Sequence, residues 1–186
     1  VQVLSAGFEG LTAHGVPVNI PVANQGGAVA PAVADHAIGM ILAMTRQISL
    51  ITLQSKDKVW NKEFPRPVVA LEGKTIAVVG YGNIGREIAK RAKAFDTSVI
   101  GVSRSLTSDE FADEMCPMTD LHKVLARADI VALAVASSKS TYHLMDAAAF
   151  NATKKGAMFV NVTRGETVDQ SALKQALESG QLASAF

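Results

Sequence analysis

The sequence contains few of the residues that characterise secreted, membrane-bound or nucleic-acid-binding proteins. Its single cysteine, Cys116, excludes an intrachain disulfide and agrees with a reducing compartment, so we expect a cytoplasmic protein. Aromatic residues make up only 5% of the chain, the formal net charge is +1 and no run of basic residues occurs. We therefore expect neither nucleic acid nor a membrane surface as a partner. No charged leader precedes the apolar residues 1–4, so we predict no signal peptide.

The most apolar stretch, residues 28–45, contains Pro31, Asp35 and His36 and is therefore a poor membrane span. Its apolar residues recur at helical spacing, and a proline is acceptable in the first turn of a helix. We predict a long packed helix that extends over residues 28–53. The chain has 186 residues, of which 48% are apolar, which is enough for one substantial domain and a piece of another.

A glycine-rich segment, residues 80–85, lies between an apolar strand-like run and a helical run. In a dinucleotide site Gly80 lets the chain turn, Gly82 lets the backbone approach the pyrophosphate, and Gly85 lets helix and strand pack closely. The N-terminus of the helix then supplies N–H groups and positive dipole to the phosphates. The alternative is a purely structural strand-to-helix turn. The candidate cofactor-binding residues here are Gly80, Tyr81, Gly82, Asn83, Ile84 and Gly85.

The strand expected over residues 98–102 ends where an NAD site usually offers a carboxylate to the ribose, roughly 20 residues after the glycines. This chain has Ser103, Arg104 and Ser105 there. A guanidinium forms paired charge-assisted bonds to a 2′-phosphate, which a carboxylate would repel. We therefore favour NADP(H) over NAD(H) as the cofactor; the alternative is a solvated arginine without a ligand. We predict no metal site.

Strands and helices alternate along the rest of the chain, which predicts right-handed βαβ units and a parallel sheet. The expected strands lie near residues 76–80, 98–102, 129–135, 157–161 and 182–186. The expected helices lie near residues 83–95, 119–127, 145–154 and 169–179. The polar segment 106–119 is expected to be a solvated loop, with Cys116 as a bystander thiol rather than a nucleophile.

A domain boundary is predicted near residue 24, where a strand over residues 16–20 gives way to the long helix. We assign residues 1–24 to the end of another domain and residues 25–186 to the dinucleotide-binding domain. The first residue is not a methionine, and the last residues have the pattern of a strand that is beginning. Both ends therefore suggest a fragment.

Several segments, in order along the chain, resemble the D-isomer-specific 2-hydroxyacid dehydrogenases. They are Ser5-Ala6-Gly7-Phe8, Asn24 with Val33-Ala34-Asp35-His36-Ala37, Gly80 to Gly85, Thr141-Tyr142-His143-Leu144, and Asn161-Val162-Thr163-Arg164-Gly165 with Val168-Asp169. The resemblance implies a Rossmann-type α/β fold with a doubly wound parallel sheet, preceded by the end of a flavodoxin-like substrate domain. It also implies hydride transfer between NAD(P)H and a small 2-keto or 2-hydroxy acid, such as glyoxylate or hydroxypyruvate.

The resemblance also assigns roles to residues outside the glycine segment. Arg164 corresponds to the family's catalytic arginine, whose planar guanidinium can bind a substrate carboxylate or keto oxygen. The alternative is an ordinary surface arginine. Ala6 and Gly7 would bind the substrate carboxylate through backbone N–H groups, although a plain tight turn would use the same residues. The remaining implied cofactor contacts are Thr141, Val162, Thr163 and Arg164, and a structural turn would explain Thr141 as well.

The family's catalytic glutamate and histidine would lie beyond the last residue, and none of the four histidines here takes that role. We therefore expect the 186-residue chain alone to be inactive. Two functions stay open: the cofactor-binding portion of a reductase, favoured by Arg164, and a non-catalytic dinucleotide-sensing module of the corepressor type. The resemblance and the apolar helix at residues 28–53 together predict a homodimer.

Overall fold

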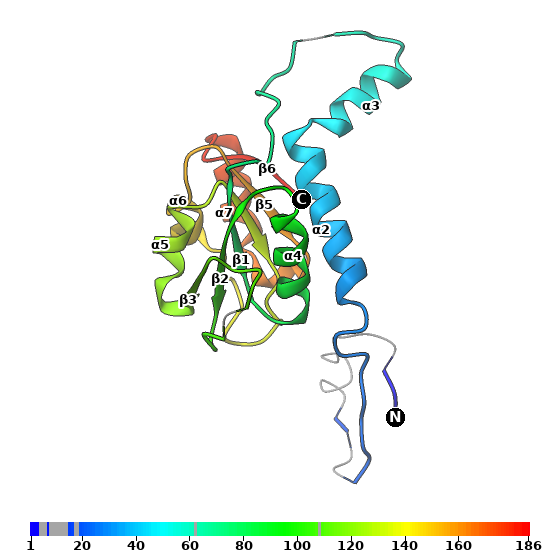
Figure 1. Cartoon of the computed structure of the whole chain (residues 1–186), viewed down its shortest axis with the longest axis vertical. Helices are drawn as coiled ribbons and strands as arrows, with labels where there is room; N and C mark the ends of the chain where they lie inside the picture. The colour runs from blue at the N-terminus through cyan, green and yellow to red at the C-terminus, as the bar shows by residue number, and fades with distance from the viewer. Residues whose placement is uncertain (4–6, 8–14, 17–18, 62, 108) are drawn as a thin grey trace.

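Six parallel strands form the centre of the computed structural model, which describes residues 1–3, 7, 15–16, 19–61, 63–107 and 109–186 (Figure 1). Their spatial order is β3-β2-β1-β4-β5-β6, so the chain starts in the middle of the sheet and builds outward in both directions. The strands are β1 (Thr75–Val79), β2 (Ser98–Ser103), β3 (Glu114–Pro117), β4 (Ile130–Leu133), β5 (Ala157–Asn161) and β6 (Leu182–Ala185). This confirms the predicted doubly wound α/β fold of the Rossmann type.

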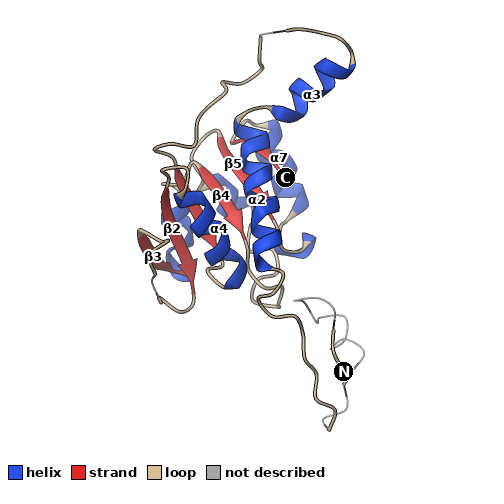
Figure 2. Ribbon diagram, turned by 45° about the vertical axis from the view of Figure 1, so that its right-hand side comes forward, coloured by secondary structure: helices blue, strands red, loops and turns tan. Residues whose placement is uncertain are grey.

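Helices cover both faces of the sheet (Figure 2). On one face α2 (Ala30–Thr45) and α4 (Asn83–Lys93) pack over the central strands, with Ile41 and Ile88 fully buried. On the other face lie three shorter helices: α5 (Leu121–Leu125), α6 (Ala147–Asn151) and α7 (Gln170–Glu178). Two 3-10 turns, η1 (Met118–Asp120) and η2 (Gly165–Thr167), precede α5 and α7. Strands buried on both faces explain why they are nearly continuous apolar runs.

Local signals in the sequence explain where several helices begin and end. The Asp146 carboxylate accepts a hydrogen bond from the Ala149 N–H, and Asp169 caps α7 in the same way. Pro31 lies in the first turn of α2, as predicted, and Gly180 ends α7 with a φ of 72°. Helices α5 and α6 are shorter than predicted, because turns occupy the flanking residues.

The helix predicted over residues 28–53 is wrong as a single element. It divides into α2 and α3 (Ile48–Lys56), which are bent by 69°. Gln47 between them adopts a left-handed conformation with a φ of 53°, and its buried side-chain amide donates to the carbonyl of Arg66. This bond to a distant loop stabilises a break that no glycine or proline announces. None of the residues of α3 is buried.

The solvated loop predicted over residues 106–119 is also wrong in its second half, which forms the edge strand β3. Its acidic residues are paired rather than simply hydrated: Asp113 bonds the Lys93 ammonium at 2.8 Å, and Glu114 bonds Arg127. Arg127 lowers the pKa of Glu114 to about 2. Cys116 is buried in this strand, and burial raises the pKa of its thiol, which agrees with a bystander role.

The N-terminal segment contributes little regular structure among its described residues. Gln2 and Ala23 form an isolated parallel bridge. Of the strand predicted over residues 16–20, residues 17–18 lie outside the described part, while Asn19 and Ile20 lie in a turn and a bend. No single helix in the described ranges is long and apolar enough to cross a membrane; the bent pair α2 and α3 passes that test only when taken together.

We predict that Gly85→Ala destabilises the fold, whereas Gly39→Ala does not. A Cβ at Gly85 would lie 2.1 Å from the backbone oxygen of Gly80, but a Cβ at Gly39 in α2 meets nothing within 4 Å. The first change overpacks a backbone contact and should cost about 1–3 kcal/mol, while the second should stabilise α2 by up to about 1 kcal/mol. Urea unfolding followed by circular dichroism measures both, and equal stabilities would contradict the close-packing argument.

Candidate functional site

A hollow of about 900 Å³ opens at the carboxyl ends of β1, β2 and β4. The strand order reverses direction between β1 and β4, and ligands of open parallel sheets bind at such a switch point. The lining residues come from the glycine turn, the end of β2 and the loop after β4. They are Gly80, Tyr81, Gly82, Ser103, Arg104, Ser105, Met118, Ala134, Val135, Ala136, Ser138, Ser140, Thr141 and Leu144.

The three glycines of the turn have separate physical roles. Gly80 has a φ of 100°, and a Cβ there would lie 2.5 Å from the Val135 nitrogen, so the turn packs directly on the chain that leaves β4. Gly85 allows α4 to approach the Gly80 carbonyl. Gly82 is exposed, with nothing within 4 Å of a Cβ, so its backbone is open to a ligand.

Helix α4 starts immediately after Gly82, with no side-chain cap and no acidic residue in its first turn. Its first N–H groups and the positive end of its dipole are therefore available to bind an anion beside the turn. This donor set and the open backbone at Gly82 fit a dinucleotide pyrophosphate. Asn83 and Ile84 are not on the lining itself; Ile84 packs partly into the core beneath the turn.

The end of β2 brings Ser103, Arg104 and Ser105 to the same hollow, as the sequence predicted. The Ser103 hydroxyl donates to the carbonyl of Ser105, which turns the chain away from the sheet. Arg104 is exposed, and within the described ranges none of the salt bridges includes it. This edge of the hollow can therefore present a guanidinium to an incoming anion.

A carboxylate that the sequence analysis did not single out lies next to this edge. Asp109 accepts hydrogen bonds from the Tyr81 hydroxyl at 2.7 Å and from Arg86 Nε at 2.5 Å. Burial opposes ionisation of Asp109, but these bonds and one from the Phe111 N–H lower its pKa below the ordinary value. Burial, followed by the bond to Asp109, raises the pKa of Tyr81 well above its usual range. Both groups therefore keep fixed protonation states near neutral pH.

Arg164 follows β5, beyond the carboxyl end of the strand, and its side chain is exposed. Its carbonyl accepts bonds from Thr167 Oγ1 at 2.7 Å and from Asn161 Nδ2 at 3.2 Å. The Thr163 hydroxyl links Asn161 and Thr167 at 2.5 and 2.8 Å, respectively. This network of hydroxyl and amide groups fixes the backbone that carries the guanidinium. Val162, Thr163 and Arg164 do not line the hollow at the glycine turn.

Thr141 lines the hollow through the loop after β4. Its hydroxyl donates to the Ala136 carbonyl at 2.7 Å and accepts from the Ser138 N–H at 2.9 Å, so it closes the loop. Ser137 bonds Glu166, which connects this loop to the segment that follows β5. Of the two predicted carboxylate-binding residues, Ala6 lies outside the described part of the chain, and Gly7 is described but does not line the hollow.

The other lining residues were not predicted. They are Met118, Ala134, Val135, Ala136, Ser138, Ser140 and Leu144. For those that follow β4 the sequence offered a usable signal, because the ends of neighbouring parallel strands meet at one edge of the sheet. The backbone of Ala134 and Val135 lies directly against the glycine turn, where a Cβ on Gly80 would meet it.

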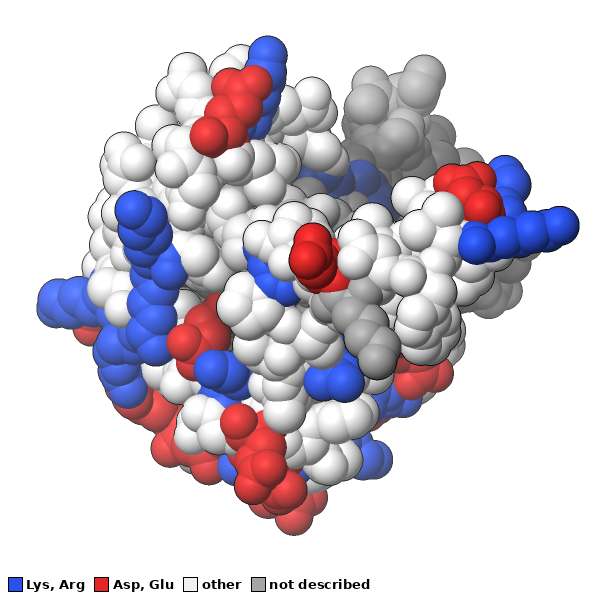
Figure 3. Space-filling model, turned by 90° about the horizontal axis from the view of Figure 1, so that it is seen from above, with Lys and Arg blue, Asp and Glu red and all other residues white. Residues whose placement is uncertain are grey.

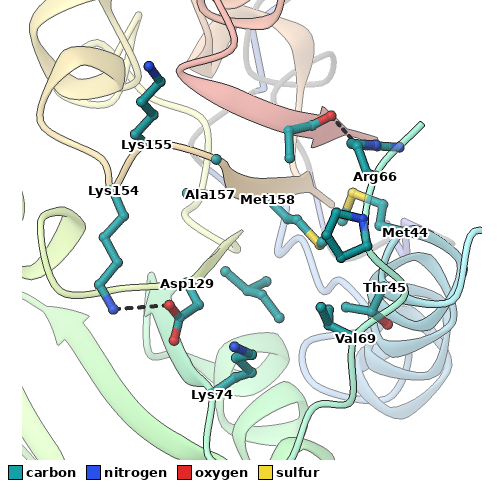
Figure 4. A pocket seen from close by; sticks show the side chains of 14 residues that line it. Met44, Thr45, Arg66, Val69, Lys74, Asp129, Lys154, Lys155, Ala157 and Met158 are labelled. Atoms are coloured by element: carbon teal, nitrogen blue, oxygen red, sulfur yellow. Dashed lines mark hydrogen bonds and ion pairs between the residues drawn. The ribbon is translucent and has the colours of Figure 1, made fainter. Parts of the chain in front are cut away.

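A second hollow of about 360 Å³ lies at the opposite edge of the sheet (Figure 4). Apolar residues such as Val69 and Met158 line much of it, with Lys74, Lys154 and Asp129 among its charged groups. Lys154 bonds Asp129 at 3.0 Å, and the Thr75 N–H bonds the same carboxylate at 2.8 Å. The turn at Gly156 that lines this hollow leads into β5 and not into a helix, so we assign the dinucleotide site to the larger hollow, where a glycine turn leads into α4. On the face seen from above, charges of both signs alternate without a dominant basic region (Figure 3).

Comparisons with known proteins agree with this geometry. Residues 38–186 match the family model described as D-isomer specific 2-hydroxyacid dehydrogenase, NAD binding domain. The chain belongs to this family. A hydroxypyruvate reductase of Thermotoga maritima is 35% identical over 88% of this chain and 52% of that protein. A glyoxylate reductase of Thermofilum pendens is 37% identical over 89% of this chain and 50% of that protein.

Solved structures of D-isomer-specific 2-hydroxyacid dehydrogenases share the fold. A family member from Aeromonas salmonicida superposes with a TM-score of 0.89 at 32% identity, covering 99% of this chain and 58% of that one. Another, from Xanthobacter autotrophicus in complex with NADPH and MES, has a TM-score of 0.83 at 28% identity and covers 100% of this chain and 58% of that one. The chain thus spans about half the length of the curated relatives it matches, and its residues 38–186 correspond to the NAD-binding domain of the family.

Proposed function

We propose that this chain binds NADP(H) and forms part of a reductase that transfers hydride between the nicotinamide and a small 2-keto or 2-hydroxy acid. The observation that carries the proposal is the 900 Å³ hollow at the switch point of the sheet, where the glycine turn and the N-terminus of α4 converge. The relatives named glyoxylate reductase and hydroxypyruvate reductase support acids of that size as substrates.

In this proposal different residues of the chain bind the cofactor and the substrate. Backbone N–H groups from Gly82 to Gly85 hold the pyrophosphate, and the bound nicotinamide supplies or accepts the hydride. Val162 and Thr163 would border the nicotinamide. Arg164 binds the substrate carboxylate or polarises the keto oxygen, since a guanidinium aimed at developing negative charge stabilises the transition state. Ala6 and Gly7 would complete the carboxylate site with backbone N–H groups.

The preference for NADP(H) rests on the charge at the end of β2. The three residues Ser103 to Ser105 contain one guanidinium and no carboxylate, and all of them line the hollow. A 2′-phosphate carries negative charge that the NAD ribose lacks, so Arg104 interacts with NADP(H) more strongly than with NAD(H). The NADPH complex of the Xanthobacter relative shows that a similar fold accepts this cofactor.

A second copy of the chain is the proposed partner, as in the predicted homodimer. Helix α3 projects away from the sheet and buries none of its residues, and the exposed fractions are 59% for Leu53 and 88% for Trp60 (Figure 1). Helix α3 contacts α2 but leaves the apolar side chains of Ile48, Ile51 and Leu53 exposed, which fits a surface that a symmetric copy covers. We also propose the cytoplasm as its location and residues 1–24 as the end of the substrate domain.

The proposed cofactor preference can be tested by titration. Titration of the chain with NADPH and NADH, followed by nicotinamide fluorescence, should show tighter binding of NADPH. Arg104→Asp should reverse the order, because it replaces an attractive charge with a repulsive one; each tenfold change in affinity corresponds to about 1.4 kcal/mol. Arg46→Asp, an equal charge change outside the hollow, is the control. Unchanged relative affinities in the Arg104 variant would exclude this arginine from ribose recognition.

The proposed role of Arg164 in substrate binding can be tested separately from cofactor binding. In a protein that joins this domain to a substrate domain, Arg164→Ala should lower kcat/KM by about 10²–10³-fold with nearly unchanged NADPH affinity, because the guanidinium acts on the substrate. Arg164→Lys restores the charge but not the planar fork and should recover only part of the activity. Normal turnover of the alanine variant would remove Arg164 from the mechanism. Cofactor binding without any turnover in the unaltered protein would favour the dinucleotide-sensing alternative.

The proposed dimer can be tested by placing a charge on α3. Leu53→Glu should shift sedimentation toward monomer, because the interface would have to bury an unpaired carboxylate. Ser55→Glu adds the same charge to the same helix and should have a smaller effect. A monomeric mass of the unaltered chain at every concentration would contradict the dimer.

A further inference from the structure

The Asp109 carboxylate joins three segments that lie far apart in the sequence. Its Oδ1 atom accepts from the Tyr81 hydroxyl in the glycine turn at 2.7 Å and from the Phe111 N–H at 2.9 Å. Its Oδ2 atom accepts from Arg86 Nε in the first turns of α4 at 2.5 Å. We call this arrangement of Tyr81, Arg86 and Asp109 the latch. It ties the segment after β2 to the two elements that hold the pyrophosphate.

Phe111 adds a second anchor for the same segment. Its ring lies under two cations of α4, with Arg86 Cζ at 5.2 Å and Lys90 Nζ at 5.8 Å from the ring centroid. The ring is half-buried against the core cluster on the α2 and α4 face. Asp109 and Phe111 are therefore held against α4 and the glycine turn a few residues after β2 ends at Ser103.

The position of Tyr81 explains how the latch reaches the ribose end of the hollow. A Cβ on Gly101 of β2 would lie 2.7 Å from Tyr81 Cδ2, so the tyrosine ring rests directly on the strand. Two residues later the same strand presents Ser103, followed by Arg104. The tyrosine thus lies between the pyrophosphate turn and the residues proposed to receive the 2′-phosphate, and it lines the hollow with both.

We propose that Asp109 is a positioning residue that sets the cofactor preference by holding Arg104 and its flanking serines at the adenosine end of the site. The proposal rests on the proposed dinucleotide function. A bond to a 2′-phosphate is strong only if the donors are already ordered, because ordering a flexible loop on binding costs affinity. NADH lacks this phosphate, so loss of the order affects NADPH binding selectively.

The charge of Asp109 supports this role rather than direct contact with the cofactor. A carboxylate beside the ribose would repel a 2′-phosphate, but here both oxygens are engaged by a hydroxyl, a backbone N–H and a guanidinium. The side chain is only 19% exposed. The latch thereby offsets the charge of the carboxylate with the Arg86 guanidinium and occupies both of its oxygens.

The test uses the intact chain and two small changes. Tyr81→Phe removes one hydroxyl but keeps the ring on Gly101, and Asp109→Asn removes the charge that pairs with Arg86. Each should raise the Kd for NADPH about tenfold, the equivalent of losing part of one charged hydrogen bond, and change the Kd for NADH less than about twofold. Glu110→Gln, an equal charge change on the adjacent exposed residue, should leave both constants unchanged.

A double-mutant cycle shows whether the effect passes through the arginine. In an Arg104→Ala background, Asp109→Asn should no longer alter NADPH affinity, because the group that it positions is absent. An undiminished effect in that background would overturn the proposal, as would equal losses for both cofactors or a selective loss of NADH. Thermal unfolding and NADH binding confirm that each variant is folded. If the unaltered chain binds neither cofactor, the proposed function itself fails; if it binds both and the latch variants change nothing, only the positioning role fails.

Discussion

The contact that the site depends on is a close approach of three backbone segments, namely the glycine turn, the start of α4 and the chain leaving β4. A Cβ at Gly80 would lie 2.5 Å from the Val135 nitrogen, and one at Gly85 would lie 2.1 Å from the Gly80 oxygen. Because no side chain fits between these segments, the turn is held rigidly at the edge of the sheet. That rigidity directs the N-terminus of α4 at the hollow and leaves the backbone at Gly82 as the exposed surface.

Features encoded by neighbouring residues were predictable from the sequence. The five strands predicted from residue 76 onward, the glycine turn and the stop at Gly180 depend on residues close together in the sequence, and the structure contains them. The break at Gln47 and the edge strand β3 were missed, since both depend on distant partners. Gln47 bonds the carbonyl of Arg66, and β3 pairs with β2 while its acidic residues meet Lys93 and Arg127. From composition alone we expected Asp113 and Glu114 to be hydrated, but the fold pairs them with these two cations.

The same division applies to the site. Ser103 to Ser105 could be predicted because a parallel strand must end at the ligand edge, so position follows from strand length. Asp109 could not, because its significance lies in a hydroxyl 28 residues away and a guanidinium 23 residues away. A carboxylate in an acidic surface segment resembles any other solvated charge until the fold brings Tyr81 and Arg86 to it. The sequence placed Val162, Thr163 and Arg164 together after β5, and the structure has them there. They do not line the hollow at the glycine turn.

The two ends of the proposed site therefore distinguish cofactor and substrate by different physical means. At the pyrophosphate the donors are backbone N–H groups, which are common to both dinucleotides and confer no preference. A preference needs a side chain. In our proposal Arg104 recognises the 2′-phosphate only if its segment is ordered, so Asp109, a residue outside the hollow, would affect specificity. Beyond β5, the backbone of Arg164 is fixed by neutral hydroxyl and amide groups of Asn161, Thr163 and Thr167. The guanidinium of Arg164 also donates to the Thr163 carbonyl at 3.0 Å. The bonds that the Arg164 carbonyl accepts from Asn161 and Thr167 are made by the backbone, so they do not depend on which side chain stands at position 164.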